Sequence, residues 1–184
     1  LYGAVMGCFG GFSSRGLLQM LYSAVKVPLL LLASFAISLP SFFVVSTLLG
    51  LRSDFSQAVR ALLATQGGLA IILASLAPFT ALWYLSSANY AAAVTFNGVM
   101  FAVASFSSQW LLRSYYRPLV ARNPRHRWLL RVWIVIYAFV AIQMAWILRP
   151  FIGEPGTAVQ FFRDDVRSGD AYFTVGKLLW NALF

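Results

Sequence analysis

Residues 27–51 read VPLLLLASFAISLPSFFVVSTLLGL and contain no charged side chain. The stretch lies between Lys26 and Arg52, and at about 1.5 Å per helical residue it is long enough to cross the ~30 Å hydrocarbon core of a bilayer. Pro28 stands near its start, where a missing N–H costs little, whereas Pro40 stands in its interior and predicts a bend. The stretch therefore predicts a transmembrane helix.

The composition of the whole chain agrees with this interpretation. Of its 184 residues, 60% are hydrophobic and 10% are charged, whereas soluble domains are roughly 45–50% apolar and about 25% charged. A soluble domain of this size needs a polar surface that these residues do not supply, so we expect the chain to lie in lipid. The net charge of +9 comes mainly from arginines beside apolar stretches, which favours anionic phospholipids over nucleic acid as a partner.

Three further spans follow from the distribution of charge. Residues 61–112 are uncharged, too long for one span and suitable for two. The polar residues 86–89 follow a Trp-Tyr pair of the kind that prefers the headgroup region, so they mark the turn between the two spans. We therefore expect spans at 61–84 and 90–112, and a fourth at 130–148.

The two ends of the chain have a different character. Residues 1–12 are too short to cross a bilayer, and Gly3, Gly7 and Gly11 recur every four residues, which would let a neighbouring helix approach closely. We interpret this segment as the end of a truncated span, with a glycine-rich interfacial loop as the alternative. Residues 149–184 carry both charge signs, and helical spacing of their apolar residues predicts an extramembrane or interfacial amphipathic tail.

The expected fold is thus all-α. Residues 1–148 form a polytopic transmembrane bundle of four complete spans and a truncated first one, followed by amphipathic C-terminal helices. The loop at 113–131 holds six arginines and no acidic residue. Because short basic loops stay on the cytoplasmic side, we expect this loop in the cytoplasm and the C-terminal tail in the periplasm.

The spans lack the residues that catalysis and metal binding require. The four complete spans contain no His, Cys, Asp or Glu, so they offer no ligands for haem or zinc and no catalytic groups for intramembrane proteolysis. Cys8 is the only cysteine, and His126 stands alone among arginines, where we expect an exposed loop residue. The sequence therefore predicts no catalytic residue, no metal site and no cofactor.

Polar and small residues within the spans predict helix packing. Gln66, Asn97 and Gln143 are the strongest polar residues there, and each is interpreted as a contact between helices, with a shared polar pathway as the alternative. Small residues beside Asn97 and along the last span predict close-packing faces. These packing candidates are Asn97, Gly98, Ala102, Ala138, Ala141 and Ala145, together with Gly3, Gly7 and Gly11.

The basic loop is the strongest charge feature of the chain. Its arginines have planar guanidinium groups that suit phosphate oxygens. A polybasic run beside a span also fixes orientation and attracts anionic lipid headgroups, and we prefer that interpretation to a specific phosphate ligand. The residues concerned are Arg113, Arg117, Arg122, Arg125, Arg127 and Arg131.

A family resemblance rests on residues near the first complete span. AVKVP at 24–28, Pro40 and LLGLR at 48–52, followed by a short loop and closely spaced spans, resemble bacterial members of the Yip-domain family. The resemblance implies a five-span protein of the bacterial inner membrane with a cytoplasmic N-terminus, in which residues 1–12 end the first span. Eukaryotic members act in vesicle traffic by binding partners. The resemblance assigns no functional residue.

These observations lead to two expectations for function. The preferred one is a non-enzymatic integral membrane subunit that packs against other membrane subunits to assemble or stabilise a complex. The alternative is a small transporter or channel component, with the three span amides forming a polar pathway. The two differ in whether those amides converge on one cavity.

Overall fold

The computed structural model describes residues 1–10, 14–87, 89–153 and 159–162. Within these ranges the fold is all-α, without a strand, and the prediction of a helical bundle is confirmed. The elements in chain order are α1 (Tyr2–Gly7), the 3₁₀ turn η1 (Cys8–Gly10), α2 (Ser14–Leu48), the 3₁₀ turn η2 (Arg52–Asp54), α3 (Phe55–Ser86), α4 (Tyr90–Arg122) and α5 (His126–Leu148).

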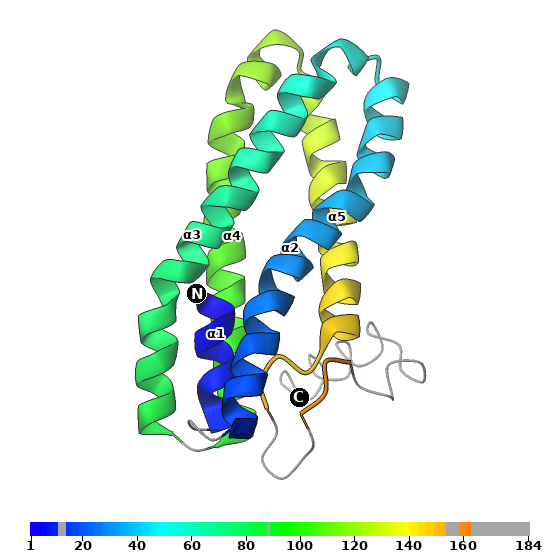
Figure 1. Ribbon diagram of the computed structural model, residues 1–184. Helices are drawn as coiled ribbons and strands as arrows, with labels where there is room; N and C mark the ends of the chain where they lie inside the picture. Colours follow the sequence, from blue (N-terminus) through cyan, green and yellow to red (C-terminus); the bar gives the residue numbers. More distant parts are fainter. Residues whose placement is uncertain (11–13, 88, 154–158, 163–184) are drawn as a thin grey trace, which may run out of the picture.

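Four helices of the described chain, α2 to α5, are long and apolar enough to cross a membrane. They run up and down in alternation, with the short α1 alongside α2 (Figure 1). At about 1.5 Å per residue the longer helices exceed the ~30 Å hydrocarbon core, so their ends extend into the headgroup regions. Many large apolar side chains point outward, among them Leu85, Phe106 and Trp110, each at least 78% exposed. Such a surface suits a lipid environment.

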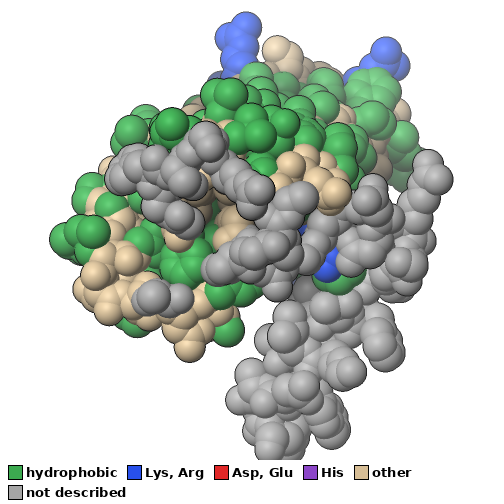
Figure 2. Space-filling model, turned by 60° about the horizontal axis from the view of Figure 1, so that its bottom comes forward, with side chains coloured by type: hydrophobic (Ala, Val, Ile, Leu, Met, Phe, Trp, Pro, Cys, Tyr) green, Lys and Arg blue, Asp and Glu red, His purple; other side chains and the backbone are tan. Residues whose placement is uncertain are grey.

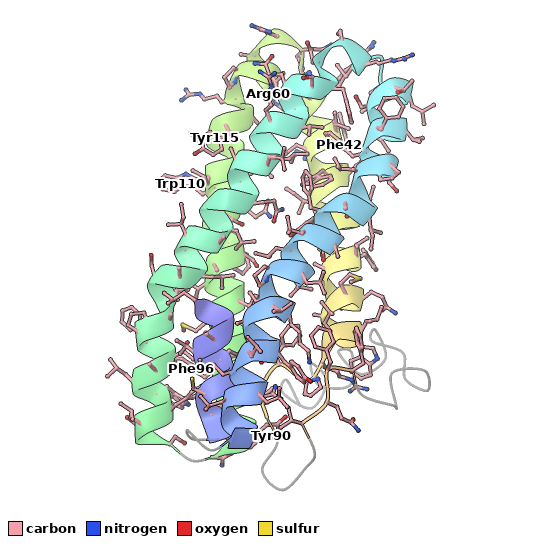
Figure 3. The ribbon with its side chains drawn as sticks, viewed as in Figure 1. Phe42, Arg60, Tyr90, Phe96, Trp110 and Tyr115 are labelled. Carbon is pink, nitrogen blue, oxygen red and sulfur yellow. The ribbon has the colours of Figure 1, made fainter. Side chains whose placement is uncertain are left out.

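Hydrophobic and basic side chains occupy different parts of the surface. In the view that brings the end opposite the α2–α3 turn forward, hydrophobic side chains cover much of the visible described surface (Figure 2). Basic side chains project at the far margin, and a few basic atoms show beside the grey ones. The side-chain view labels Arg60 close to the opposite end of the bundle, and Trp110 and Tyr115 projecting outward from α4 (Figure 3). We call the end that contains the α2–α3 and α4–α5 turns the arginine end.

The helices pack in pairs rather than as an even ring. α3 packs mainly against α4, and α2 packs against α5 and α1. Near the arginine end Trp133 of α5 meets Phe35 and Phe42 of α2 edge to face, with ring centroids 5.7 and 5.1 Å apart. A second buried cluster near the other end joins Tyr2 and Met6 of α1 to α2, α3 and α4, and to Ile152 beyond the end of α5. The packing leaves α4 and α5 with little mutual contact.

Several helix boundaries differ from the predicted spans. α2 begins at Ser14 rather than near residue 27. Polar residues before position 27, such as Gln19 and Lys26, donate hydrogen bonds to carbonyl groups of residues 150 and 151, so they do not end the helix. The arginine-rich stretch at 113–131 is mostly helical: α4 continues to Arg122, and α5 begins at His126. Arginine is a good helix former, and its long side chain reaches the headgroup region from a helix end.

The segments flanking the bundle are only partly described. Residues 149–153 leave α5 and pack against α2, and residues 159–162 are not helical. Most of the predicted amphipathic tail, and Gly11 of the predicted glycine face, lie outside the described residues. Residues 2–7, interpreted as either a span end or a loop, are helical.

Candidate functional site

The candidate site is the opening between α4 and α5. The two helices follow each other in the chain and run antiparallel, yet each finds its main packing partner elsewhere. Two hollows lie between them. One is near the C-terminal end of α5 and is apolar, and the other is at the arginine end and is basic.

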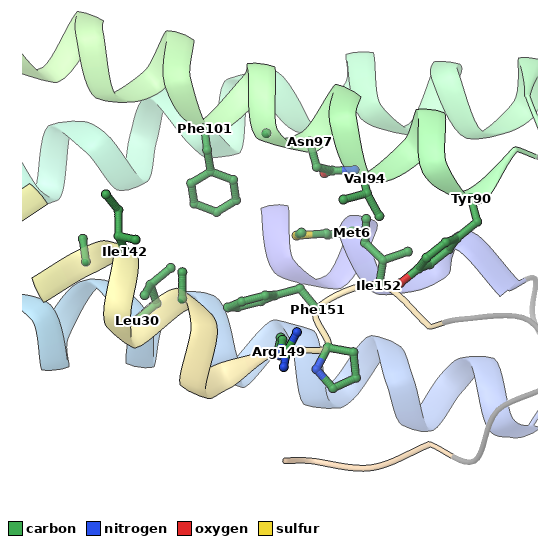
Figure 4. Close-up of a pocket in the computed structure, with 14 residues that line it drawn as sticks. Met6, Leu30, Tyr90, Val94, Asn97, Phe101, Ile142, Arg149, Phe151 and Ile152 are labelled. Carbon is green, nitrogen blue, oxygen red and sulfur yellow. The ribbon is translucent and has the colours of Figure 1, made fainter. Parts of the chain in front are cut away.

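The apolar hollow has a volume of about 580 Å³, within the range of small-molecule sites. Its walls combine small residues with bulky apolar ones, as the close-up shows for Phe101, Ile142 and Phe151 (Figure 4). At one end lies Arg149, whose guanidinium stacks over the Trp146 ring at 3.5 Å. The hollow therefore offers an apolar groove with a cation at its mouth.

The predicted small residues fall into two groups. Gly3 and Gly7 lie inside the chain's own packing, where a Cβ would stand 2.2 Å from the Ser23 carbonyl oxygen and 2.6 Å from the Met20 Cα. The others lie at the α4–α5 opening or on the exposed surface near it. Gly98, Ala141 and Ala145 line the apolar hollow, while Ala102 and Ala138 are exposed.

Asn97 borders the apolar hollow beside Gly98 (Figure 4), but its amide group is hydrogen-bonded inside the bundle. Its Oδ1 accepts a hydrogen bond from the Tyr2 hydroxyl at 2.9 Å, and its Nδ2 donates to the Tyr84 hydroxyl at 2.6 Å. The Asn97 side chain is 1% exposed. One amide thus joins α1, α3 and α4, whereas Gly98 points to open space.

The other two span amides lie elsewhere. Gln66 accepts a hydrogen bond from the Tyr137 hydroxyl at 3.1 Å and lines a separate hollow between α2 and α3. The Gln143 Oε1 is buried without a hydrogen-bond partner and belongs to neither hollow. Among the hollows that the described residues line here, Asn97 belongs to the one between α4 and α5, Gln66 to the one between α2 and α3, and Gln143 to neither.

The six arginines of the predicted basic loop separate into two sets. The first set lines the basic hollow, of about 320 Å³, over an apolar floor formed by Val120, Leu130 and Ile134. Its members are Arg113 and Arg117 on α4 and Arg127 and Arg131 on α5. On each helix the two arginines are four residues apart, so they share a face.

The second set, Arg122 and Arg125, reaches the α2–α3 turn instead. Arg122 Nη1 donates to Gln57 Oε1 at 3.3 Å, and Arg125 Nη1 donates to the Leu49 carbonyl at 3.4 Å. These contacts hold the two turns of the arginine end together.

The expectation that His126 is an exposed loop residue is wrong. Its side chain is 0% exposed, and its Nε2 lies 3.1 Å from Asp54 Oδ2. The Tyr116 ring packs edge to face on the imidazole, with centroids 5.7 Å apart. Because Asp54 and His126 are 72 residues apart in sequence, only the folded turns bring them together.

Three polar side chains of α2 have a role that the sequence analysis did not predict. Gln19, Ser23 and Lys26 lie on one face of α2 and donate hydrogen bonds to carbonyl oxygens of Pro150 and Phe151. Lys26 Nζ donates to the Pro150 oxygen at 2.7 Å and lies 5.0 Å from the Phe161 ring centroid. The spacing of 19, 23 and 26 was the available signal, since it places three polar side chains on one helical face.

The site contains no arrangement typical of metal binding. Across the described ranges, no group of three or more His, Cys, Asp or Glu side chains lies close enough together to hold a metal ion. The chemistry that the α4–α5 opening offers is apolar contact at one end and four guanidinium groups at the other.

Comparison with protein-family models, with curated proteins and with solved structures gave no match for this chain. The resemblance to the Yip-domain family therefore stays a prediction from the sequence. The fold class therefore rests on the helices themselves. In the described part of the chain, four helices are long and apolar enough to cross a membrane.

Proposed function

We propose that this chain is a non-enzymatic subunit of a membrane complex and that it packs laterally against another membrane protein through the α4–α5 opening. The proposed occupant is one apolar transmembrane helix of that partner. We further propose that the chain resides in a bacterial inner membrane with its arginine end in the cytoplasm.

The observation that supports this proposal is the sparse packing between α4 and α5, which meet mainly near the arginine end. Neighbouring antiparallel helices in a bundle normally bury a shared face. Here the two walls instead present Gly98 on α4 and Ala141 and Ala145 on α5 to an open groove. Small residues allow another backbone to approach closely, and in lipid such packing is the main force for helix association.

The alternative of a polar transport pathway has less support. It predicts that Gln66, Asn97 and Gln143 converge on one cavity, and they lie in separate places. Two of them have protein partners that connect helices, as expected for structural hydrogen bonds.

Filling the groove tests the proposal. We expect Gly98→Leu combined with Ala141→Leu to reduce co-purification of the partner at least several-fold after mild-detergent extraction, because the added side chains occupy the place of the partner helix. The matched control is Gly67→Leu, since Gly67 also has open space beside it but lies in the hollow between α2 and α3. Native mass measurement gives the composition of each complex. A wild-type chain that extracts as a monodisperse monomer contradicts the proposal, as does equal loss in the control.

A further inference from the structure

We propose that the basic hollow between α4 and α5 binds the headgroup of a phospholipid that carries at least two phosphate charges. The acyl chains of this lipid lie along the exposed faces of α4 and α5. The site goes beyond the proposed partner interface and does not depend on it.

The arrangement of the arginines is the first argument. Arg113 and Arg117 face Arg127 and Arg131 across the hollow, so guanidinium groups approach a ligand from two helices. Each group offers a planar fork of donors that matches phosphate oxygens in a bidentate fashion. Arginines that only fix orientation need no common hollow, and Arg122 and Arg125 lie outside it.

The uncompensated charge is the second argument. Asp54 is the only acidic residue in the described part of the chain, and it pairs with His126. No carboxylate within the described ranges therefore offsets the four charges that share this hollow. A headgroup with one phosphodiester supplies one negative charge, whereas a headgroup with two phosphates offsets twice as much and can contact both helices. Basic pockets between transmembrane helices on the cytoplasmic side are known to suit such headgroups.

The surroundings place the hollow at the membrane surface. Trp110 of α4 is 81% exposed and Trp128 of α5 is 62% exposed, and the Arg131 guanidinium lies 5.0 Å from the Trp128 ring centroid. Exposed tryptophans prefer the headgroup level of a bilayer. A ligand in the hollow therefore lies where lipid phosphates are concentrated.

The path for acyl chains continues from the same helix faces. On α4, Phe106 and Trp110 precede the arginines at helical spacing, and both are exposed. On α5, Ile134 forms part of the floor and the exposed Val135 follows Arg131 by four residues. This apolar surface leads from the hollow toward the membrane core, which a lipid needs and a free phosphate does not.

The test compares lipids and variants on the purified full chain in detergent. Native mass spectrometry counts the retained lipid during titration with cardiolipin, which has two phosphodiesters, and with phosphatidylglycerol, which has one. We expect the wild type to retain cardiolipin preferentially at matched total charge. Arg117→Gln with Arg127→Gln removes one guanidinium from each wall, and we expect a loss of cardiolipin affinity of about tenfold or more.

The matched control is Arg52→Gln with Arg60→Gln. Arg52 lies on the η2 turn at the arginine end and Arg60 on the first turns of α3, and neither lines the hollow, so the control removes the same charge outside the site. We expect less than about twofold change there. Equal losses in the two pairs, or equal retention of the two lipids by the wild type, would overturn the proposal.

Two additions keep the test decisive. If Arg117→Gln with Arg127→Gln fails to fold by circular dichroism, Arg113→Gln with Arg131→Gln replaces it, with the same expected loss. Inorganic pyrophosphate carries comparable charge without acyl chains, and displacement of cardiolipin by pyrophosphate at similar concentration would show a site for soluble phosphate and overturn the lipid assignment. Partner capture by the Gly98→Leu and Ala141→Leu variant is measured separately, so failure of one proposal is distinguishable from failure of the other.

Discussion

Asn97 places one amide group where three helices meet. Its oxygen accepts from Tyr2, and its nitrogen donates to Tyr84 and to the Ala93 carbonyl at 2.8 Å. In the apolar interior of a bundle an unpaired amide is costly, so the bonds to Tyr2 and Tyr84 favour the observed arrangement of α1, α3 and α4, while the bond to Ala93 stays within α4. The residue therefore acts as a joint between helices.

The energetic role of this joint leads to a prediction. Asn97→Leu keeps the number and branching of the side-chain heavy atoms and removes the hydrogen bonds to both tyrosines, so we expect it to lower the free energy of unfolding by about 1–2 kcal/mol. The control is Thr95→Val on the exposed side of α4, where the hydroxyl bonds only the Ala91 carbonyl of its own helix. Denaturant titration in mixed micelles measures both variants. A difference between them below about 0.5 kcal/mol would mean that the joint adds little stability.

At the scale of elements, α1 depends on two glycines. Gly3 and Gly7 bring its backbone against that of α2, with the nearest contacts at the Ser23 carbonyl and at Met20. These contacts are with backbone atoms, which cannot rotate away as a side chain can. The six-residue helix is too short to be stable alone, so the close contact with α2 holds it in place.

Adding one methyl group therefore distinguishes two kinds of glycine. We expect Gly3→Ala to destabilise the chain by about 1–3 kcal/mol, because the new Cβ overlaps the Ser23 carbonyl. Gly67→Ala has nothing within 4 Å of its Cβ and removes a flexible residue from a helix interior. We expect it to be neutral or stabilising by up to about 1 kcal/mol. Thermal unfolding in detergent compares the two variants, and the same sign of shift in both would contradict the packing explanation.

The elements themselves were largely predictable, and their ends were not. Uncharged stretches such as residues 27–51 identify helices because a bilayer crossing demands length and apolarity. Lys26 misleads this reasoning, since a charge normally marks a span boundary. In the structure its amine donates to the Pro150 carbonyl, so α2 continues past it toward the N-terminus. The hydrogen bond to Pro150 offsets the cost of placing the Lys26 amine inside the protein, and no local sequence pattern predicts this distant contact.

At the scale of the whole molecule, the sequence does not reveal which residues far apart in the chain come into contact. The sequence predicts that the six arginines between Arg113 and Arg131 lie near lipid headgroups. It does not tell which of these arginines line the basic hollow and which contact the α2–α3 turn. That division depends on how α4 and α5 face each other. The pairing of His126 with Asp54 likewise depends on two distant turns meeting. Patterns of local spacing carry no information about either.

Basic residues are distributed unequally between the two ends of the bundle. The arginine end holds eight arginines, namely Arg52, Arg60, Arg113, Arg117, Arg122, Arg125, Arg127 and Arg131. Elsewhere the described chain has three basic residues, Arg15, Lys26 and Arg149. Short loops rich in Lys and Arg stay in the cytoplasm during insertion, so this asymmetry predicts the orientation of the whole bundle.

Cysteine labelling measures that orientation directly. In a Cys8→Ser background, Ser53→Cys places an exposed thiol on the η2 turn of the arginine end, and Asn89→Cys places one on the exposed turn between α3 and α4 at the other end. We expect a membrane-impermeant maleimide to label Asn89→Cys in intact cells, and to label Ser53→Cys only after the membrane is opened. Labelling of both variants after detergent lysis controls for reactivity. α3 runs from the first turn to the second as one candidate span, so the two thiols should lie on opposite sides of the membrane. Labelling of Ser53→Cys in intact cells would therefore reverse the assigned orientation. It would also place the basic hollow outside the cytoplasmic leaflet, whose anionic lipids attract juxtamembrane arginines.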